Sequence, residues 1–347
     1  MVKKRSRALC VPLKQAEPLR RSLKDQHLLR EEYKIFKEGN FIFFPLKKTL
    51  IDLPNYPIVS KSFEVRTRTP SCYKDLLRLP KKLQKDLPTS YDVVGSIILI
   101  KLPQSLFQYR KQIGNALLAT HKNIRTVCLI DPVSGELRIR HVAIIAGVNR
   151  TLTTHTEYGL TFAVDVDTTY FSSRLATERR RIASQVRPGE TVVDLFTGVA
   201  PFSIMISKYA HPKVIYAIDK NPEAILLAKQ NVKQNHLLQI IEVIQGDAKD
   251  AEKLIPTKAD RIIMNLPFSA HQFFAAALSI AAPVCKVHYY DIIRQEAMEE
   301  RISSLKTIAK TKGFLLADVQ IHRMKSYAPR EFYIGLDITA TKHADVA

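Results

Sequence analysis

The stretch Val192-Val-Asp-Leu-Phe-Thr-Gly-Val-Ala-Pro-Phe-Ser-Ile204 decides the fold of this 347-residue chain. Its apolar start predicts a buried strand that ends at Asp194, Gly198 predicts a turn, and Pro201 fits the first turn of a helix. A strand, a tight turn and a helix in this order place backbone N–H groups and a helix N-terminus at the carboxyl edge of a parallel sheet. The stretch therefore predicts a ligand site at this edge.

The same alternation continues along the chain. Strands are expected over residues 191–196, 214–219, 240–245, 260–265 and 286–291, with helical stretches between them. This order is typical of a doubly wound, mostly parallel Rossmann-like sheet. Two further runs, 314–324 and 331–339, are expected to pair as an antiparallel hairpin at the sheet edge. The apolar stretch 273–285 is too short to span a bilayer and contains Pro283, so it predicts a buried helix.

The front half follows another pattern, and the chain is predicted to have four parts. They are a small N-terminal α+β module (1–65), a linker rich in Lys, Arg and Pro (66–90), an α+β domain (91–185) and the Rossmann-like catalytic domain (186–347). In the first module we expect a helix within 15–33 and a strand over 40–45. In the 91–185 domain we expect strands over 93–100, 126–130, 136–142 and 158–166, and a helix around 106–119.

The positive charge lies mainly in the front half. The formal net charge is +20, and residues 1–190 hold 34 of the 53 Lys and Arg residues but only 17 of the 33 acidic residues. A basic excess in one half favours a polyanion-binding surface, and RNA is the partner we expect. A merely solubilising basic surface is the alternative. An anionic membrane is not favoured, because no basic amphipathic helix with an aromatic face is visible.

The four cysteines are scattered without a Cys-x-x-Cys pair, at positions 10, 72, 128 and 285. This spacing argues against a zinc site or a disulfide framework, so we expect no metal. No apolar segment follows the basic start of the sequence, so no signal peptide is expected. These observations predict a cytoplasmic protein without a membrane partner.

Acidic residues end three successive predicted strands. Asp219 follows Gly198 by 21 residues, the distance at which a carboxylate accepts hydrogen bonds from both ribose hydroxyls of a nucleotide-like cofactor. An N-cap for the helix that begins near Pro222 is the alternative role of Asp219. Asp247 is placed to accept from an adenine amino group. Three acids and a single-glycine turn fit S-adenosylmethionine better than NAD.

The fourth predicted strand ends in Asn265-Leu-Pro-Phe268. Asn-x-Pro-aromatic at this place resembles the tetrapeptide of methyltransferases that act on nitrogen atoms of nucleobases. A side-chain amide both donates to and accepts from a base edge. A plain turn is the structural alternative. His271 is expected to be a helix N-terminal residue rather than a catalyst.

Several motifs together resemble one family, the archaeal and eukaryal tRNA (guanine-N1)-methyltransferases, which modify guanosine 37 beside the anticodon. They are Asn149-Arg-Thr-Leu-Thr153, Tyr170-Phe-Ser-Ser-Arg-Leu-Ala-Thr-Glu-Arg179, Asn265-Leu-Pro267 with His271 downstream, and Ser326-Tyr-Ala-Pro-Arg-Glu331. The resemblance covers essentially the whole chain. It implies that the N-terminal module grips the outer corner of the tRNA and that the rest holds the anticodon stem-loop. The family precedent is a monomer, and no stable protein partner is expected.

The resemblance also assigns residues. It implies that Glu178 is the general base, that Arg138 is the catalytic arginine and that Asn265 positions the base. A larger set is expected to bind the cofactor: Tyr170, Phe171, Arg179, Asp194, Phe196, Gly198, Asp219, Lys220, Asp247, Ala248, Asn265 and Pro267. The chain departs from the family at Ser173, where Pro is common, at Ala176-Thr177, where Gly-Gly is common, and at Ala200, where a second Gly is common. The last departure weakens the turn if a positive φ is needed there.

These residues would perform a simple reaction. Guanine N1 is a poor nucleophile until its proton leaves, and a nearby carboxylate such as Glu178 removes that proton. Loss of the proton puts negative charge on O6, which the guanidinium of Arg138 would stabilise. The target base has to flip out of the anticodon loop. The alternative role of Glu178 is an ion pair with Arg174 or Arg181, and the alternative role of Arg138 is a contact with a phosphate.

Three other functions remain open from the sequence. One is a transferase of the wybutosine pathway, which delivers a methyl or aminocarboxypropyl group to a tricyclic guanosine at the same tRNA position. The second is an amino-methylase that acts on adenine or cytosine, although Leu266 stands where such enzymes usually have a second Pro. The third is an RNA-binding protein without catalysis. Neither the tRNA species nor the tolerance for other bases at position 37 follows from the sequence.

Overall fold

The computed structural model describes residues 3–47, 56–65, 72–131, 140–328 and 330–343. The chain divides between Leu76 and Leu77 into two compact units, which are described separately. Within the described ranges no helix has the length and apolar character needed to cross a membrane.

The first unit is a four-stranded sheet covered by one helix. Its elements are β1 (Lys3–Pro12), α1 (Ala16–Asp25), β2 (Phe36–Glu38), β3 (Phe41–Pro45) and β4 (Ile58–Glu64), with strand order β2-β3-β1-β4. Leu23 of α1 packs with Leu9, Val11 and Phe44 in a core that belongs to this unit. The expected helix and the 40–45 strand are confirmed. Strand β1 was not predicted, because its basic first half hides the alternation of buried side chains.

The second unit begins with another four-stranded sheet and a helix. Its elements are α2 (Lys81–Gln84), β5 (Asp92–Val94), β6 (Ile97–Ile100), η3 (Gln104–Tyr109), α3 (Arg110–Thr120), β7 (Thr126–Ile130) and β8 (Val142–Gly147), with strand order β5-β6-β7-β8. The short helix η2 (Tyr73–Leu76) lies at the end of the first unit. One prediction is wrong, because the expected strand 93–100 is two strands joined by a turn at Gly95, whose φ is +53°. Of the strand expected over 136–142, residues 136–139 lie outside the described residues, and β8 begins at Val142 beside β7.

A hairpin leads from this sheet to the catalytic part. It consists of β9 (Leu152–Glu157) and β10 (Leu160–Asp165), and η4 (Ser173–Leu175) and α4 (Ala176–Gln185) follow it. The strand expected over 158–166 is confirmed as β10. Strand β9 was not predicted, because Leu-Thr-Thr-His-Thr-Glu lacks the apolar side chains that mark a strand.

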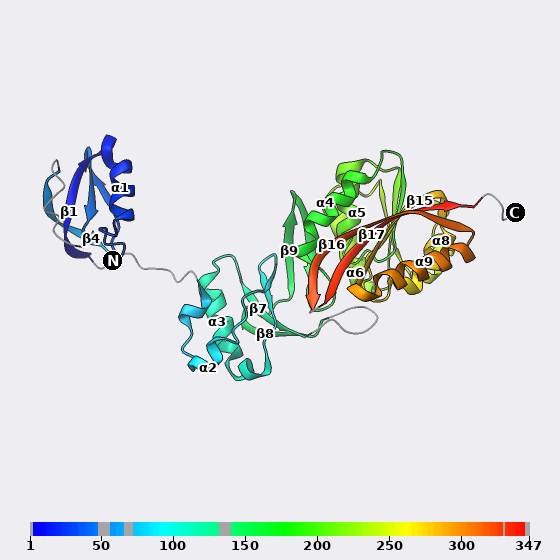
Figure 1. The fold of residues 1–347 in the computed structure, drawn as a ribbon, viewed down its shortest axis with the longest axis horizontal. Helices are drawn as coiled ribbons and strands as arrows, with labels where there is room; N and C mark the ends of the chain where they lie inside the picture. The colour runs from blue at the N-terminus through cyan, green and yellow to red at the C-terminus, as the bar shows by residue number, and fades with distance from the viewer. Residues whose placement is uncertain (1–2, 48–55, 66–71, 132–139, 329, 344–347) are drawn as a thin grey trace. The chain divides into compact units, whose positions relative to one another are not determined.

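The catalytic part is a seven-stranded sheet with order β13-β12-β11-β14-β15-β17-β16. The first five strands are parallel, and β16 and β17 form the antiparallel hairpin, which runs along one side of the sheet in Figure 1. The bounds are β11 (Thr191–Asp194), α5 (Pro201–Ala210), β12 (Val214–Asp219), α6 (Pro222–Gln234), β13 (Ile241–Gln245), η5 (Ala248–Asp250), α7 (Ala251–Leu254), β14 (Ala259–Met264), η6 (Ala270–Phe273), α8 (Phe274–Ser279), β15 (Ala281–Arg294), η7 (Gln295–Ala297), α9 (Met298–Thr311), β16 (Phe314–Ala328) and β17 (Glu331–Lys342). The predicted α/β fold is therefore confirmed.

Both faces of this sheet are covered. Val192 points into one core with residues of α4, α5 and α6, and its neighbour Val193 points into the opposite core with residues of α7, α8 and α9. The strand order reverses between β11 and β14. In an open parallel sheet this switch point, at the carboxyl ends of the strands, is where ligands bind.

One prediction in this part needs correction. The apolar stretch 273–285 is not a single helix, because α8 ends at Ser279 and β15 starts at Ala281. Beyond that point Val284, Cys285 and Val287 pair with β17, so the stretch divides between a helix and a strand that share one apolar core. A short apolar run does not distinguish these two states.

Candidate active site

A pocket of about 280 Å³ lies at the carboxyl ends of β11, β12, β13 and β14, at the switch point of the sheet. Ten of the twelve residues predicted to bind a cofactor line it: Tyr170, Phe171, Arg179, Phe196, Gly198, Asp219, Lys220, Asp247, Ala248 and Asn265. Asp194 lies behind the lining, and Pro267 follows the lining residues Asn265 and Leu266. The sequence pattern and the geometry therefore select the same cavity.

Asp194 holds the loop after β11 in place by hydrogen bonds from within the core. This side chain is 1% exposed, and the hydroxyls of Thr197 and Ser203 donate to its Oδ2 at 3.0 and 2.9 Å. Burial raises the pKa of Asp194 to about 6. Ala200 has a φ of +65°, the left-handed conformation in which a second glycine would carry no strain. The departure from the family at Ala200 thus falls on a strained backbone position.

Asp219 closes the floor of the pocket. Its Oδ2 accepts from the backbone N–H of Gly198 at 2.6 Å, and its Oδ1 accepts from that of Asn221 at 2.9 Å. Burial raises the pKa of this carboxyl. The N-cap of α6 is Asn221, which accepts from Glu223 N at 3.0 Å, so the alternative role of Asp219 as the N-cap is wrong.

Asp247 follows the third strand, β13, by two residues and lines the same pocket. Its side chain caps η5 by accepting from Lys249 N at 2.9 Å, and Lys220 Nζ lies 3.4 Å from its Oδ2. These contacts, the hydrogen bond from Lys249 above all, lower the pKa of Asp247. It therefore presents an ionised acceptor at the rim.

The Asn265 loop is held from two sides. The Tyr333 hydroxyl donates to Asn265 Oδ1 at 2.7 Å. Phe268 has a φ of +75°, and its backbone N–H donates to Oδ1 of the fully buried Asp291 at 3.1 Å. The Tyr289 hydroxyl donates to the other oxygen of Asp291 at 2.7 Å. These bonds fix the loop against the sheet.

Arg179 forms the wall between the pocket and the β9–β10 hairpin. Its Nε donates to Glu157 Oε2 at 2.9 Å, its Nη2 donates to the Ser172 carbonyl at 3.1 Å, and its guanidinium lies over the Phe171 ring at 5.2 Å. Although burial raises the pKa of Glu157, hydrogen bonds from His155 and Arg179 lower it overall. Arg179 thus binds the residues that shape the wall, and Phe171 among them lines the pocket.

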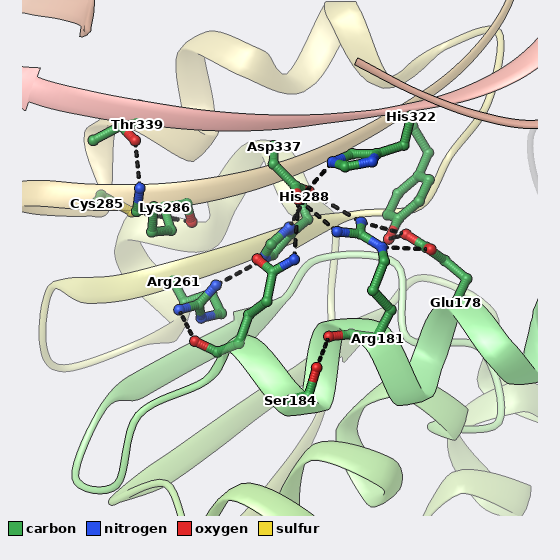
Figure 2. Close-up of polar contacts among 12 residues, drawn as sticks. Glu178, Arg181, Ser184, Arg261, Cys285, Lys286, His288, His322, Asp337 and Thr339 are labelled. Carbon is green, nitrogen blue, oxygen red and sulfur yellow. Dashed lines mark hydrogen bonds and ion pairs between the residues drawn. The ribbon is translucent and has the colours of Figure 1, made fainter. Parts of the chain in front are cut away.

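Glu178 lies on α4 next to this wall but outside the pocket lining. Arg181 Nε and Nη2 donate to its two oxygens at 2.8 and 2.7 Å, and the Tyr290 hydroxyl donates to Oε1 at 2.7 Å (Figure 2). Its side chain is 10% exposed. The predicted ion pair with Arg181 is confirmed, whereas Arg174 pairs with Asp92 instead.

Two tyrosines connect Glu178 to Asn265. The rings of Tyr290 and Tyr333 stack, with centroids 6.1 Å apart and planes at 16°. Tyr290 donates to Glu178 and Tyr333 donates to Asn265, so a stacked pair joins the two residues predicted to act on the base.

A second, smaller cavity adjoins the first and shares Tyr170, Ser172 and Leu175 with it. Its other lining residues are Lys101, Arg140, Ile292, Lys325, Tyr327 and Tyr333. Burial, followed by repulsion from Arg174, Arg140 and Lys101, lowers the pKa of Lys325. Arg138, the predicted catalytic arginine, lies outside the described residues. Arg140 lies 5.5 Å from the centroid of the Tyr170 ring.

The comparisons with known proteins agree with this geometry. The family model described as the TRM5/TYW2 methyltransferase domain matches residues 153–317. The models for the TYW2 N-terminal domain and the tRNA methyltransferase 5 N-terminal domain match residues 73–151 and 8–52. The fold and site thus define an S-adenosylmethionine-dependent tRNA methyltransferase.

Whole-chain relatives define the family more narrowly. The tRNA (guanine(37)-N(1))-methyltransferase Trm5b of Pyrococcus abyssi is 36% identical over 332 residues, which are 95% of this chain and 98% of the relative. Trm5b of Methanocaldococcus jannaschii is 35% identical, over 96% of this chain and 99% of the relative. The chain belongs to the Trm5 family of S-adenosylmethionine-dependent tRNA (guanine37-N1)-methyltransferases. This confirms the resemblance and sets aside the amino-methylase and the non-catalytic alternatives.

Solved structures show the same fold. The crystal structure of Trm5b from Pyrococcus abyssi matches with a TM-score of 0.78 and 36% identity, over 97% of this chain and 99% of that one. A complex of an aTrm5 with tRNALeu matches with a TM-score of 0.81 and 34% identity, over 96% and 99%. That complex shows a family member bound to tRNA, the partner that the resemblance implies.

The residues that hold the predicted site residues in place were not predicted from the sequence. Tyr290 and Asp291 lie on β15, Tyr333 and Asp337 lie on β17, and none of them belongs to a motif. The spacing of Glu178 and Arg181 did signal their pair, because residues three apart lie on one helix face. The contacts of Tyr290 with Glu178 and of Asp337 with Arg181 span 112 and 156 residues of sequence, and Tyr333 lies 68 residues from Asn265. One sequence holds no signal for contacts at such separations.

Proposed function

We propose that this chain methylates N1 of guanosine 37 in tRNA, with Glu178 as general base, Asn265 positioning the base and Arg138 stabilising O6. The observation that carries the proposal is the stacked pair of Tyr290 and Tyr333, which holds Glu178 and Asn265 in one assembly beside the pocket. Residues 87 positions apart in the sequence are fixed together in this way. Such pre-organisation is what a reaction limited by positioning and deprotonation requires.

The residues of the larger pocket fit S-adenosylmethionine, which supplies an activated methyl group when bound. The buried Asp219 carboxylate, with its raised pKa, would accept from ribose hydroxyls, and Asp247 would accept from an amino group at the rim. Phe171 and Phe196 offer apolar ring faces in the same cavity. The predicted cofactor set is proposed on this basis, with Asp194 acting through the Gly198 loop rather than by contact.

The second cavity suits the flipped nucleotide. It adjoins the first cavity, and Lys101, Arg140 and Lys325 supply positive charge for the phosphates while Tyr327 and Tyr333 supply aromatic surface for a base. During the reaction the N1 proton would pass to a Glu178 oxygen, and the freed electron pair on N1 would form the new N–C bond as the S–C bond of the methyl donor breaks and its electron pair stays on sulfur. Residues 91–185 would hold the anticodon stem-loop and residues 1–65 the outer corner of the tRNA.

The test is methyl transfer from labelled S-adenosylmethionine to tRNA transcripts with G37 or A37. We expect N1-methylguanosine only with G37, and a loss of about 10²–10⁴-fold in Glu178→Gln, the usual contribution of a general base. The matched control is Glu299→Gln, the same substitution at an exposed position of α9, with unchanged rate. A Glu178→Gln enzyme that retains the wild-type rate would remove Glu178 from the chemistry.

A wybutosine-pathway activity remains the second candidate. The TYW2 N-terminal model matches residues 73–151, and a tRNA(Phe) (4-demethylwyosine(37)-C(7)) aminocarboxypropyltransferase of Methanocaldococcus jannaschii is 32% identical over 71% of this chain. Donor label that appears as an aminocarboxypropyl adduct, or only on a tricyclic guanosine, would favour this candidate over methylation of G37.

A further inference from the structure

Arg181 lies between two carboxylates, and only one of them is the proposed base (Figure 2). Its Nε and Nη2 donate to Glu178, and its Nη1 and Nη2 donate to Asp337 Oδ2 and Oδ1 at 2.6 and 3.2 Å. The side chains of Glu178, Arg181 and Asp337 are 10%, 26% and 12% exposed. One guanidinium is thus shared by two largely buried anions.

Asp337 is held independently of Glu178. His288 Nε2 lies 2.7 Å from Arg261 Nη1, and a guanidinium only donates, so this histidine nitrogen carries no proton. The proton therefore sits on His288 Nδ1, which donates to Asp337 Oδ1 at 2.7 Å. Gln185 Nε2 donates to Asp337 Oδ2 at 3.2 Å. These bonds anchor the carboxylate to β15 and to the end of α4.

Asp337 and Arg181 both stay charged. Burial raises the pKa of Asp337, but hydrogen bonds from His288, Arg181 and Gln185 outweigh it and hold this pKa well below its ordinary value. Burial lowers the pKa of Arg181, but its hydrogen bonds to Glu178 and Asp337 raise it overall. Asp337 therefore remains an anion beside the Arg181 cation.

We propose that Asp337 is a positioning residue for methyl transfer, which acts through Arg181 to hold Glu178 and to balance the charge when Glu178 accepts the N1 proton. The inference rests on the proposed role of Glu178. With Glu178 as its only anionic partner, Arg181 would make that carboxylate a weak base and would be left without a counter-ion once Glu178 became neutral. With two carboxylates, Arg181 keeps Asp337 as its counter-ion after the proton transfer.

Other charged groups around the cluster are already engaged. On α4, Arg174 pairs with Asp92, Arg179 pairs with Glu157, and Arg180 lies over the Tyr209 ring. On β14, Arg261 pairs with Glu190. The groups that face the cluster from the antiparallel strands are His322 Nε2, 3.1 Å from Asp337 Oδ2, and Lys325, 5.7 Å from the Tyr333 ring centroid.

The test measures single-turnover methylation as a function of pH in two variants, one of which removes an anion and the other a cation. The quantity compared is the acid limb, the pH range at low pH over which the rate rises. Asp337→Asn keeps the shape but gives Arg181 wholly to Glu178, so the rate should fall about tenfold and the acid limb should move to lower pH by about one unit. Arg181→Gln removes the cation, so the acid limb should move to higher pH. The matched control is Asp318→Asn on β16, where the carboxylate accepts from Gln320 at 2.9 Å and the profile should stay unchanged.

A merely structural role gives a different result. It would lower the melting temperature of both variants and leave the acid limb of the folded enzyme in place, and that result would overturn the proposal. Shifts in the same direction for both variants would also overturn it. If Asp337→Asn does not fold, Asp337→Glu keeps the charge and should keep the wild-type acid limb, whereas a shifted limb would refute the charge balance.

The two proposals fail separately. An active Glu178→Gln enzyme refutes the general base. An inactive Glu178→Gln enzyme with an unchanged acid limb in Asp337→Asn refutes only the role of Asp337.

Discussion

Gly95 forms the turn between β5 and β6, and this turn is hydrogen-bonded to β9, so replacing Gly95 tests how tightly the β5–β8 sheet and β9 are coupled. Its backbone N–H donates to His155 Nδ1 at 3.0 Å, and the next residue, Ser96, donates from its backbone to Thr153 Oγ1 at 3.0 Å. A Cβ at position 95 would overlap Thr153 Oγ1 and the carbonyl oxygen of Thr154. Because backbone is involved, a rotamer change cannot relieve this overlap.

The expected cost of Gly95→Ala has two parts. A φ of +53° costs an L-residue about 1–2 kcal/mol, and overpacking adds about 1–3 kcal/mol. Gly159→Ala is the matched control in the same unit, because its φ is +75° and nothing lies within 4 Å of the added Cβ. Gly159→Ala should therefore lower the free energy of unfolding only by the cost of the positive φ, about 1–2 kcal/mol.

Urea unfolding followed by circular dichroism measures both variants. We expect Gly95→Ala to be less stable than Gly159→Ala by roughly 1–3 kcal/mol. We also expect Gly95→Ala to reduce the affinity for tRNA more than the affinity for S-adenosylmethionine, because Lys101 and Arg140, which flank strands of the β5–β8 sheet, line the second cavity. Equal stability of the two variants would refute the reasoning, since it would mean that the turn moves freely away from β9.

Three further predictions concern the other parts of the structure. Arg179→Met should destabilise the fold by about 3–5 kcal/mol because it leaves Glu157 buried without its cation, and the double variant with Glu157→Leu should recover much of this loss in the same unfolding assay. Asp194 ionises near pH 4 in the unfolded chain but at about pH 6 in the fold, so unfolding releases a proton in this window and stability falls as pH rises. Asp194→Asn should lack this component, which is about 3 kcal/mol between pH 4 and pH 6, and parallel stability curves for the two proteins would contradict the assignment. Removing residues 1–76, the first unit, should weaken tRNA binding more than cofactor binding in titrations, whereas equal loss of both would mean that the unit supports the catalytic fold.

The strand ends of the catalytic part could be predicted because they combine two local signals. Asp219 ends an apolar strand and precedes a proline that starts a helix, and β12 has the predicted bounds. Strands β1 and β9 could not be predicted, because their side chains are too polar to show the alternation. In β9 the polar residues Thr153 and Glu157 are buried by bonding to Ser96 and Arg179, which lie far away in the sequence.

The same limit applies to the candidate site. The pocket lining was predicted because it sits on motifs at the strand ends. The surroundings of Glu178 were predicted only as far as Arg181, one helical turn away. Tyr290 and Asp337 come from β15 and β17, and whether such residues reach Glu178 depends on the position of β17 within the sheet.

That position has a consequence for synthesis of the protein. Strand β17 comes after all five parallel strands in the chain, yet it inserts between β15 and β16 and brings both Tyr333 and Asp337. A chain released from the ribosome before residue 331 would contain every strand of the cofactor pocket but neither of these side chains. It would also lack Ile334, Leu336 and Ile338, which fill one core of the sheet, so an incomplete copy would leave the apolar surface of β15 exposed.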